Sequence, residues 1–289
     1  MKQKASTAVG QHKSVAVLIP YYRNELSPDE TISLNHLRHF LGAYDRYLIS
    51  PKSLRNTLPD FKVKTFNDDY FLSVLAYNKL MLAPHFYESF LEYKYVLIYQ
   101  LDALVFSDEL RDWCDTDLDY VGAPWLRNVA VPEEGFSNVG NGGFSLRKVE
   151  SILKVLSTKK VVTDAEAYWE EFCRNHSRVS QVLNVHKKYL KRLAMFSDVK
   201  WYSKHPHDME DIFWANIAPK VCPEFRIATV QEALRFSFES APQYCFEENN
   251  RQLPFGCHAW SRNDREFWEP YLLGHKAESQ SAKSFRIRA

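Results

Sequence analysis

Asp102 is the residue whose place in this sequence most calls for a chemical explanation. It follows an apolar run inside "YKYVLIYQLDALVF" (93–106), and that run predicts a strand covered on both faces, as in a parallel sheet. An uncompensated carboxylate there is costly, so we expect Asp102 to be paired, hydrogen-bonded or bound to a cation. A divalent cation would offset the cost and could bind a diphosphate on its other face. The alternative is an Asp that caps the following turn.

Two glycines follow an asparagine in the later stretch "GNGGFSLR" (140–147). Because glycine has no side chain, Gly142 and Gly143 permit the close approach of a ligand to the backbone and unusual backbone angles. Taken alone, Asn141 and Gly142 equally fit the tight turn of a β-hairpin. The stretch is therefore either the wall of a binding site or a plain turn.

Adjacent carboxylates and a histidine complete the set of residues that could do chemistry. In "HPHDMEDIFWANI" (205–217), Glu210 and Asp211 begin a predicted helix, where they either complement the helix dipole or supply a general base to a cleft. His258 in "PFGCHAW" (254–260) is either a packed core histidine or a metal ligand. With Asp102 and two phosphate oxygens, His258 would nearly fill the coordination sphere of a cation.

The elements that must position these residues alternate between strands and helices in the first half of the chain. We expect strands at 14–20, 45–50 and 61–66, and helices at 30–42 and 73–91, the second with a break near Pro84. This alternation is typical of βαβ units and predicts an α/β fold with a parallel sheet. Ligands bind such sheets beyond the carboxyl ends of the strands, where Asp102 would lie together with Pro20, Tyr21 and Tyr22.

The second half is expected to hold a loop at 119–125, a late helix at 230–239 and, at 149–198, an insertion of two or three charged helices. Residues 1–13 are expected to be an N-terminal extension, residues 14–276 one domain, and residues 277–289 a flexible tail. Within the insertion, "HKKYLKR" (186–192) is either a solvated helix face or a docking surface for a lipid-linked acceptor at an anionic membrane.

The composition excludes some classes of protein. The 289 residues include 37 Lys and Arg against 36 Asp and Glu, which leaves no electrostatic footprint for nucleic acid. The five cysteines form no CxxC pair, as expected of reduced cysteines in a cytoplasmic protein. No apolar stretch is long enough for a membrane span, so we expect a cytoplasmic protein, with peripheral contact at the inner face of the membrane left open.

The order "QLDA", "VGAPW", "GNGGFSLR", "MEDIFW" and "FGCHAW" resembles the GT-A-fold glycosyltransferases that use nucleotide sugars. In particular, the chain resembles a bacterial family, domain of unknown function 5672, over about residues 14–275. The resemblance implies a Rossmann-type, mixed but mainly parallel sheet flanked by helices. It also implies transfer of a hexosyl group from a nucleoside diphosphate sugar, such as a UDP-sugar, to a hydroxyl of a glycan or glycolipid during polysaccharide biosynthesis.

The resemblance further implies roles for individual residues around the donor. Asp102 and His258 match metal ligands for Mn²⁺ or Mg²⁺, while Gln100 replaces the first acid of the DxD motif and leaves strict metal dependence open. Further donor-binding positions are matched by Pro20, Tyr21, Tyr22, Lys79, Asn141, Gly142 and Gly143.

On the acceptor side, Asp211 matches the base of an inverting enzyme and Glu210 a binder of a sugar or acceptor hydroxyl, although retaining relatives also carry an acidic motif here. Aromatic rings that could stack on the base or the sugar belong to Tyr21, Trp125 and Trp260, which equally fit positions in the core. Two rivals remain: a sugar-binding module without turnover, and a metal-dependent phosphoesterase, which needs a denser set of ligands.

Overall fold

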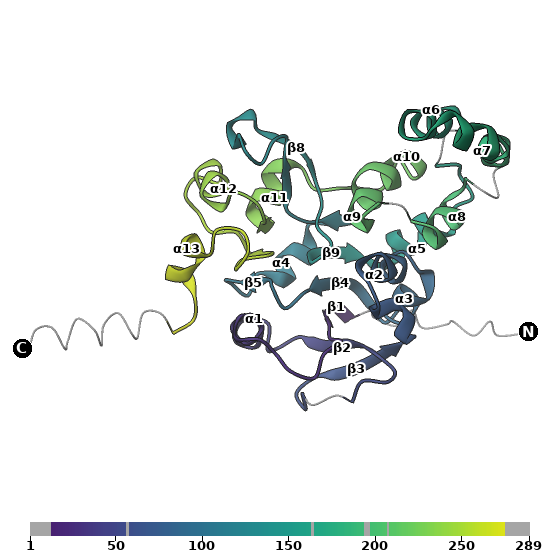
Figure 1. Ribbon diagram of the computed structural model, residues 1–289. Coiled ribbons are helices and arrows are strands. Elements are labelled where there is room, and N and C mark those ends of the chain that lie inside the picture. The colour runs from purple at the N-terminus through teal and green to yellow at the C-terminus, as the bar shows by residue number, and fades with distance from the viewer. Residues whose placement is uncertain (1–12, 56–57, 163–164, 194–196, 207, 275–289) are drawn as a thin grey trace, which may run out of the picture.

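A six-stranded sheet lies at the centre of the computed structural model, which describes residues 13–55, 58–162, 165–193, 197–206 and 208–274 (Figure 1). Along the sheet the strands follow the order β3 (Lys62–Phe66), β2 (Asp45–Pro51), β1 (Lys13–Pro20), β4 (Tyr93–Tyr99), β9 (Phe144–Lys148) and β6 (Tyr120–Val121). β1 to β4 are mutually parallel, whereas β9 runs antiparallel to β4 and β6. The predicted α/β fold with a mixed, mainly parallel sheet is confirmed.

Both faces of this sheet are buried, which explains the continuously apolar central strands. In β1, Val15, Val17 and Ile19 join the hydrophobic core on one face, and Ala16 and Leu18 join the core on the other. β4 divides its side chains in the same alternating way. Because successive residues of a strand point to opposite faces, a strand between two cores needs apolar residues at every position.

The helices of the first half begin and end close to their predicted positions. α1 (Pro28–Phe40) begins at a capping box in which the side chains of Ser27 and Glu30 bond each other's backbone N–H groups. The segment 73–91 forms two helices, α2 (Val74–Met81) and α3 (Pro84–Glu88). Proline fits the first position of a helix but cannot continue one, so the predicted break at Pro84 is confirmed.

The remaining elements include two small sheets, one of β10, β11 and β5 and one of β7 and β8. Their bounds in chain order are η1 (Asp68–Phe71), β5 (Leu104–Val105), α4 (Leu110–Asp115), β7 (Pro124–Leu126), η2 (Pro132–Glu134), β8 (Phe136–Val139), α5 (Val149–Ser157), α6 (Ala165–Asn175), α7 (Arg178–Lys191), α8 (Val199–Lys204), α9 (Glu210–Ile212), the π-helical turn η4 (Phe213–Ile217), α10 (Ala218–Val221), α11 (Val230–Phe236), β10 (Ser237–Phe238), α12 (Pro242–Glu248), β11 (Gly256–Cys257), α13 (Arg265–Trp268) and η5 (Glu269–Tyr271). The loop expected at 119–125 is therefore wrong in part, because β6 and the start of β7 lie within it.

The helix predicted at 230–239 ends early, and this difference matters for the site. α11 stops at Phe236, and β10 then pairs in parallel with β11, so that Phe238 lies opposite Cys257. Phe238 and Cys257 are fully buried in a third hydrophobic cluster that also contains Trp260 and Trp268. This burial stabilises the extended backbone of β10, so Glu239 directly follows a strand.

The segment 149–198 has two parts with different surroundings. α5 packs into the core, where Ile152 and Val155 are fully buried, whereas α6 and α7 form a helix pair that projects from the body (Figure 1). The bounds predicted for the insertion, 149–198, stay a prediction. The tail at 277–289 and, apart from Lys13, the extension at 1–13 lie outside the described residues. No helix within those residues has the length and apolar character needed to cross a bilayer.

Candidate functional site

Asp102 finds the partners that its position requires. After β4, Gln100 continues the ladder by donating its backbone N–H to the carbonyl of Gly143 at 2.8 Å, and the chain then turns. Asp102 Oδ1 lies 3.2 Å from His258 Nε2, and Oδ2 accepts a hydrogen bond from Arg262 Nη2 at 2.8 Å. Burial alone would raise the pKa of this carboxyl, but His258 and Arg262 hold it below its usual range.

His258 is the centre of the polar cluster. Its Nδ1 lies 2.8 Å from Glu239 Oε1, and its Nε2 faces both Asp102 and the side-chain oxygen of Gln100, which is 3.4 Å away. Burial would lower the pKa of the imidazole, but the two carboxylates outweigh that effect and raise it to about 9. Glu239 thus fixes the ring and directs Nε2 toward the end of β4.

The glycine stretch forms the wall of this cluster and is no hairpin. β8 pairs with β7, while β9 pairs with β4 and β6, so residues 140–143 cross between two sheets. Asn141 is buried, and its Oδ1 accepts the N–H groups of Gly143 and Phe144 at 2.8 and 2.7 Å. A Cβ on Gly143 would lie 2.0 Å from His258 Nε2. The close approach that requires glycine here is therefore to His258.

Glu210 lies behind the neighbouring glycine as half of a buried ion pair. A Cβ on Gly142 would lie 2.9 Å from Glu210 Oε1, and that oxygen already accepts a hydrogen bond from Arg147 Nη2 at 2.8 Å. Both side chains are at most 2% exposed. Arg147 also donates to the hydroxyls of Tyr87 and Ser145. Glu210 Oε2 is buried and finds no hydrogen-bond partner among the described residues, which is uncommon for a buried polar atom.

Asp211 is the carboxyl with raised proton affinity. Burial, followed by the charge of Glu210, raises its pKa to about 6, and the charge of Glu239 acts in the same direction. Its Oδ1 accepts the N–H of Ile212 at 2.9 Å. A carboxyl whose pKa lies near neutrality is suited to accept a proton and release it again.

The predicted donor-binding residues at the end of β1 and in α2 are less well placed to contact a donor than those of the polar cluster. Pro20 and Tyr21 are buried, and Tyr21 packs in the core, so its predicted stacking surface is covered. Tyr22 is 50% exposed, with the Arg23 guanidinium 5.2 Å from its ring centroid. Lys79 is exposed in the last turn of α2, and no described contact joins it to the polar cluster.

The two tryptophans expected to stack or to pack differ from each other. Trp260 is fully buried and belongs to the core, whereas Trp125 is half-buried and donates its indole N–H to the carbonyl of Gly140 at 2.7 Å.

Sequence reasoning missed three charged residues of the site: Glu239, Arg262 and Arg147. Glu239 carries the same signal as Asp102, a carboxylate directly after a buried strand, but the segment was interpreted as helix. Arg147 stands inside the apolar alternation of β9, where a buried charge demands a partner. Arg262 offers no comparable signal.

A divalent cation fits the donor set. Across the described part of the chain, no three His, Cys, Asp or Glu side chains converge to hold a metal. Asp102 and His258 do meet, however, and the amide oxygen of Gln100 adds a third donor. Because Glu239 binds Nδ1, Nε2 is the nitrogen left for a metal. Arg262, with a side chain 68% exposed, would have to give up its bond to Oδ2 for a cation to bind that oxygen. Phosphate oxygens would complete the sphere of Mn²⁺ or Mg²⁺.

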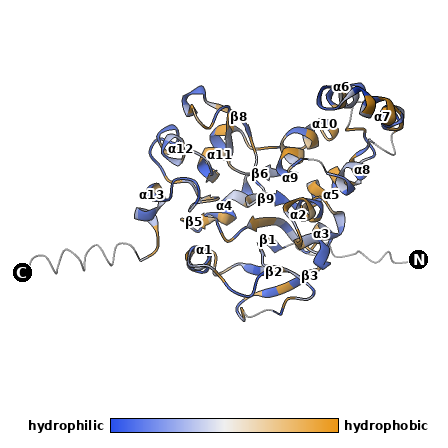
Figure 2. Ribbon diagram, viewed as in Figure 1, coloured by the Kyte–Doolittle hydropathy of each residue, from blue (hydrophilic) through white to orange (hydrophobic). Residues whose placement is uncertain are grey.

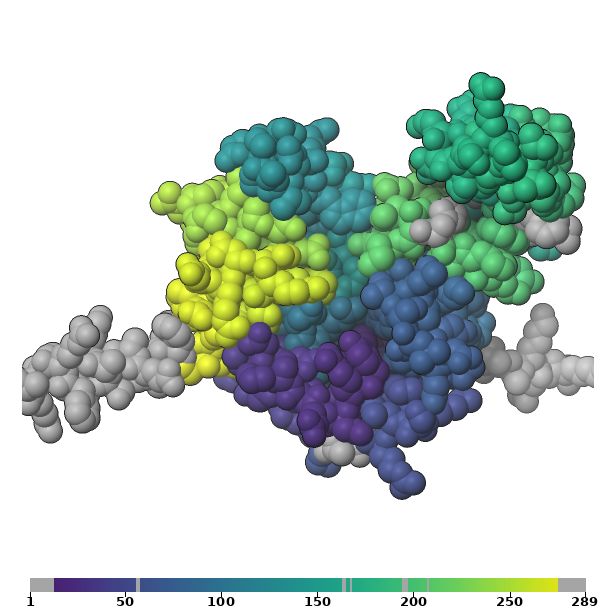
Figure 3. All heavy atoms as spheres, in the orientation of Figure 1, coloured from purple at the N-terminus to yellow at the C-terminus, as the bar shows by residue number. Residues whose placement is uncertain are grey.

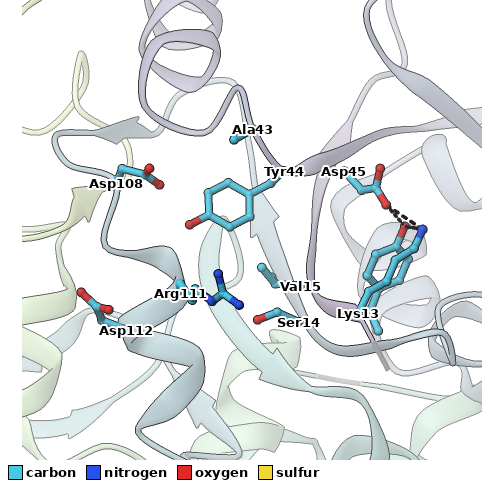
Figure 4. A pocket seen from close by; sticks show the side chains of 10 residues that line it. Lys13, Ser14, Val15, Ala43, Tyr44, Asp45, Asp108, Arg111 and Asp112 are labelled. Atoms are coloured by element: carbon cyan, nitrogen blue, oxygen red, sulfur yellow. Dashed lines mark hydrogen bonds and ion pairs between the residues drawn. The ribbon is translucent and has the colours of Figure 1, made fainter. Parts of the chain in front are cut away.

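The hollows of the surface do not all coincide with this cluster. Figure 3 shows a hollow between the purple N-terminal segment, the blue segment around α2 and the yellow-green C-terminal segment. A cavity of about 640 Å³ lies instead at the amino end of β1, lined by Lys13, Tyr44 and Asp45 among others (Figure 4). In its wall Lys13 and Asp45 bond each other. Because ligands bind open α/β sheets beyond the carboxyl ends of the strands, we place the site at that end.

Several solved structures resemble the chain at low identity. They include the galactosyltransferase LgtC in complex with donor and acceptor sugar analogues (TM-score 0.43, 12% identity, 93% of this chain and 95% of that chain covered). For a glycosyltransferase involved in glycosylation of the major capsid of PBCV-1, the TM-score is 0.44 and the identity 9%, with 89% of this chain and 98% of that chain covered. For the apo form of GlyE from Streptococcus pneumoniae TIGR4, the TM-score is 0.39 and the identity 15%, with 94% of this chain and 64% of that chain covered. Likeness at this level assigns no activity.

Sequence comparison is more decisive about the family. No curated protein matches the chain. The family described as Protein of unknown function (DUF5672) matches residues 60–258, which is more than half of the chain. The expectation from the ordered motifs is thereby confirmed, and the chain belongs to the DUF5672 family.

Proposed function

We propose that this protein is a glycosyltransferase that moves a hexosyl group from a nucleoside diphosphate sugar, in the first instance a UDP-sugar, to a hydroxyl of a glycan or glycolipid. One observation carries the proposal. At the carboxyl end of the sheet, a carboxylate and imidazole pair packs closely against a glycine stretch. An acid with a pKa of about 6, Asp211, senses the charge of Glu239, which is the other partner of that imidazole. Such ends of open α/β sheets are where ligands bind.

The donor would lie between β1 and the polar cluster. Tyr22, exposed at the end of β1, offers a face to the nucleobase. Asp102, His258 and Gln100 would hold a divalent cation, which supplies Lewis-acid stabilisation of the negative charge on the departing diphosphate. Glu239 keeps His258 oriented for that purpose. The exposed guanidinium of Arg262 would approach the same phosphates.

The acceptor hydroxyl would meet Asp211 on the other side of the glycine wall. Asp211 would take the proton as the hydroxyl attacks the anomeric carbon, and inversion of configuration follows if that attack is direct. Glu210 Oε2 would accept a hydrogen bond from a sugar hydroxyl, while Arg147 holds the Glu210 side chain in place. General-base assistance of this kind contributes about 10²–10⁴ in rate.

We further propose a bacterial, cytoplasmic reaction in polysaccharide biosynthesis. All five cysteines are free, as a reducing compartment would keep them.

The experiment that tests the proposed function is a screen of nucleotide sugars that measures diphosphate release with and without added Mn²⁺, and after EDTA. We expect release with one or a few UDP-sugars, enhanced by a suitable acceptor and reduced by EDTA. Glycan binding that needs no nucleotide, with no release from any donor, would instead identify a sugar-binding module. The anomeric configuration of the product, measured by NMR against that of the donor, decides between inversion and retention.

A further inference from the structure

The helix α7 is amphipathic in the inverted sense: its apolar side faces solvent. Val179, Val182 and Leu183 are 71%, 74% and 70% exposed, exposed Leu190 continues the same side two turns after Leu183, and exposed Leu193 follows just beyond the end of the helix. The spacing of three and four residues places these side chains along one stripe of the helix. Figure 2 shows hydrophobic residues on α7 in the projecting helix pair. A contiguous apolar stripe of this kind marks an interaction surface.

Polar contacts hold α7 in this orientation. Gln181 donates to the carbonyls of Cys173 and His176, each at 2.8 Å, and Lys188 Nζ lies 2.5 Å from Glu166 Oε2. Lys191 is 8% exposed, with its Nζ 3.5 Å from the centroid of the Trp201 ring. Rotating α7 to bury its apolar stripe would break all of these contacts. The exposed stripe is therefore a stable feature of the fold.

The charge of the helix pair indicates what could cover the stripe. Residues 165–193 contain six Lys and Arg against three Asp and Glu, a net charge of +3 within a chain whose total is +1. A second copy of the chain would bring two such positive surfaces together, which costs energy. An anionic lipid surface would attract the basic side chains and accept the apolar ones.

The position of the pair suits a flat partner. Figures 1 and 3 show α6 and α7 projecting from the body as a separate lobe. Lys187 is exposed between Leu183 and Leu190 in the sequence of α7, and a long basic side chain can extend its charged end toward lipid headgroups.

We propose that α7 docks on an anionic lipid bilayer as an interfacial helix, with Val179, Val182, Leu183, Leu190 and Leu193 inserted among the acyl chains. The proposal differs from a purely basic docking segment, because Lys188, Lys191 and Arg192 are engaged within the protein. It stands on α7 alone and holds whether or not the protein transfers sugars.

Co-sedimentation of the full chain with vesicles tests this inference. We expect binding to vesicles of phosphatidylcholine with about 30% phosphatidylserine, an anionic lipid that attracts basic side chains. Binding should be much weaker to vesicles of phosphatidylcholine alone, or to the anionic vesicles at high salt. The double variant Val182→Ser/Leu183→Ser should reduce the partition coefficient at least about tenfold, since two apolar side chains no longer insert. Lys187→Glu should weaken binding to the anionic vesicles only.

The control is Val129→Ser, which removes a side chain that is 62% exposed in the β7–β8 connection. It should bind vesicles as the unmodified protein does. Because all substituted residues are exposed, thermal unfolding should stay unchanged in every variant. Absence of binding to anionic vesicles, or binding that the double variant retains in full, would overturn the proposal. So would a stable dimer in sedimentation equilibrium that the double variant converts to monomer.

Discussion

Asp102 and Asp45 are two aspartates with nearly equal exposure, 29% and 28%, at opposite ends of the same sheet. Asp45, at the amino end of β2, accepts hydrogen bonds from Lys13, Lys62 and Tyr93, and these donors lower its pKa. A cavity of about 640 Å³ lies beside it. The neighbours of Asp102 are the imidazole of His258 and the exposed guanidinium of Arg262, and the glycine stretch packs against that imidazole.

The comparison teaches that exposure alone does not distinguish the end where we propose the site from the opposite end of the sheet. At the amino end every oxygen of Asp45 is occupied by a donor of the protein itself. At the carboxyl end, an oxygen of Glu210 is left without a partner in the described structure, and the pKa of Asp211 is raised to about 6. Groups whose bonding or protonation is incomplete are the ones that a substrate can complete.

The largest expected effect is the loss of stability when a positive charge is removed, and we expect this loss to differ between the two ends of the sheet. Arg147→Met should lower the free energy of unfolding by about 3–5 kcal/mol, because it leaves Glu210 buried without its partner. Lys62→Met, the matched change beside Asp45, should cost a small fraction of that, since Lys62 is half exposed. Urea denaturation of both variants measures the difference. Similar losses in the two would contradict the distinction between the ends.

The next effect concerns turnover. Asp211→Asn should lower kcat by about 10²–10⁴ while nucleotide affinity changes little, because the general base is lost and the donor contacts come from other segments. The variant should be at least as stable at pH 7, since a raised carboxyl pKa means that ionised Asp211 destabilises the fold.

Glu210→Gln differs from Asp211→Asn because it weakens the bond to Arg147. Glu210→Gln should therefore lower both stability and turnover. Normal kcat in Asp211→Asn would remove this residue from the base role.

Ligand binding compares the two aspartates directly. Mn²⁺ with UDP at 100 times the dissociation constant should stabilise the protein by about 2.7 kcal/mol, as any ligand specific to the folded state does. Asp102→Ala should abolish most of that stabilisation, and Asp45→Ala should retain it. Thermal unfolding with and without the two ligands makes the measurement. A full shift in Asp102→Ala would disprove its role as a ligand.

The smallest effect is the pH dependence of activity. With the pKa of Asp211 at about 6, kcat/KM should fall about tenfold per pH unit below pH 6, where the carboxyl is protonated, and level off above it. The acidic limb should disappear from the residual activity of Asp211→Asn. If that variant kept the limb, another group would be the base.

Much of the site was within reach of sequence reasoning, with one clear failure. Asp102, Asn141 and Gly143 lie beside His258, and Gly142 lies beside Glu210, while the roles predicted for these residues stay predictions. They were found because a strand end and a glycine stretch carry strong local signals. Lys79 was placed by analogy with related enzymes, without regard to helical phase, and its side chain faces solvent. Glu239 was hidden by a helix assignment that tertiary pairing with β11 overrode.

The sequence by itself determined the alternation of strands and helices, the burial of β1 and β4, and the family. Those features depend on local periodicity, capping and motif order, which neighbouring residues specify. Only the tertiary structure decided that Glu239 orients His258, that Arg147 pairs with Glu210, and that α7 presents its apolar side to solvent. Each of these is a contact or an orientation between residues distant in the chain or on different helices, and no local pattern encodes which face of an amphipathic helix is covered.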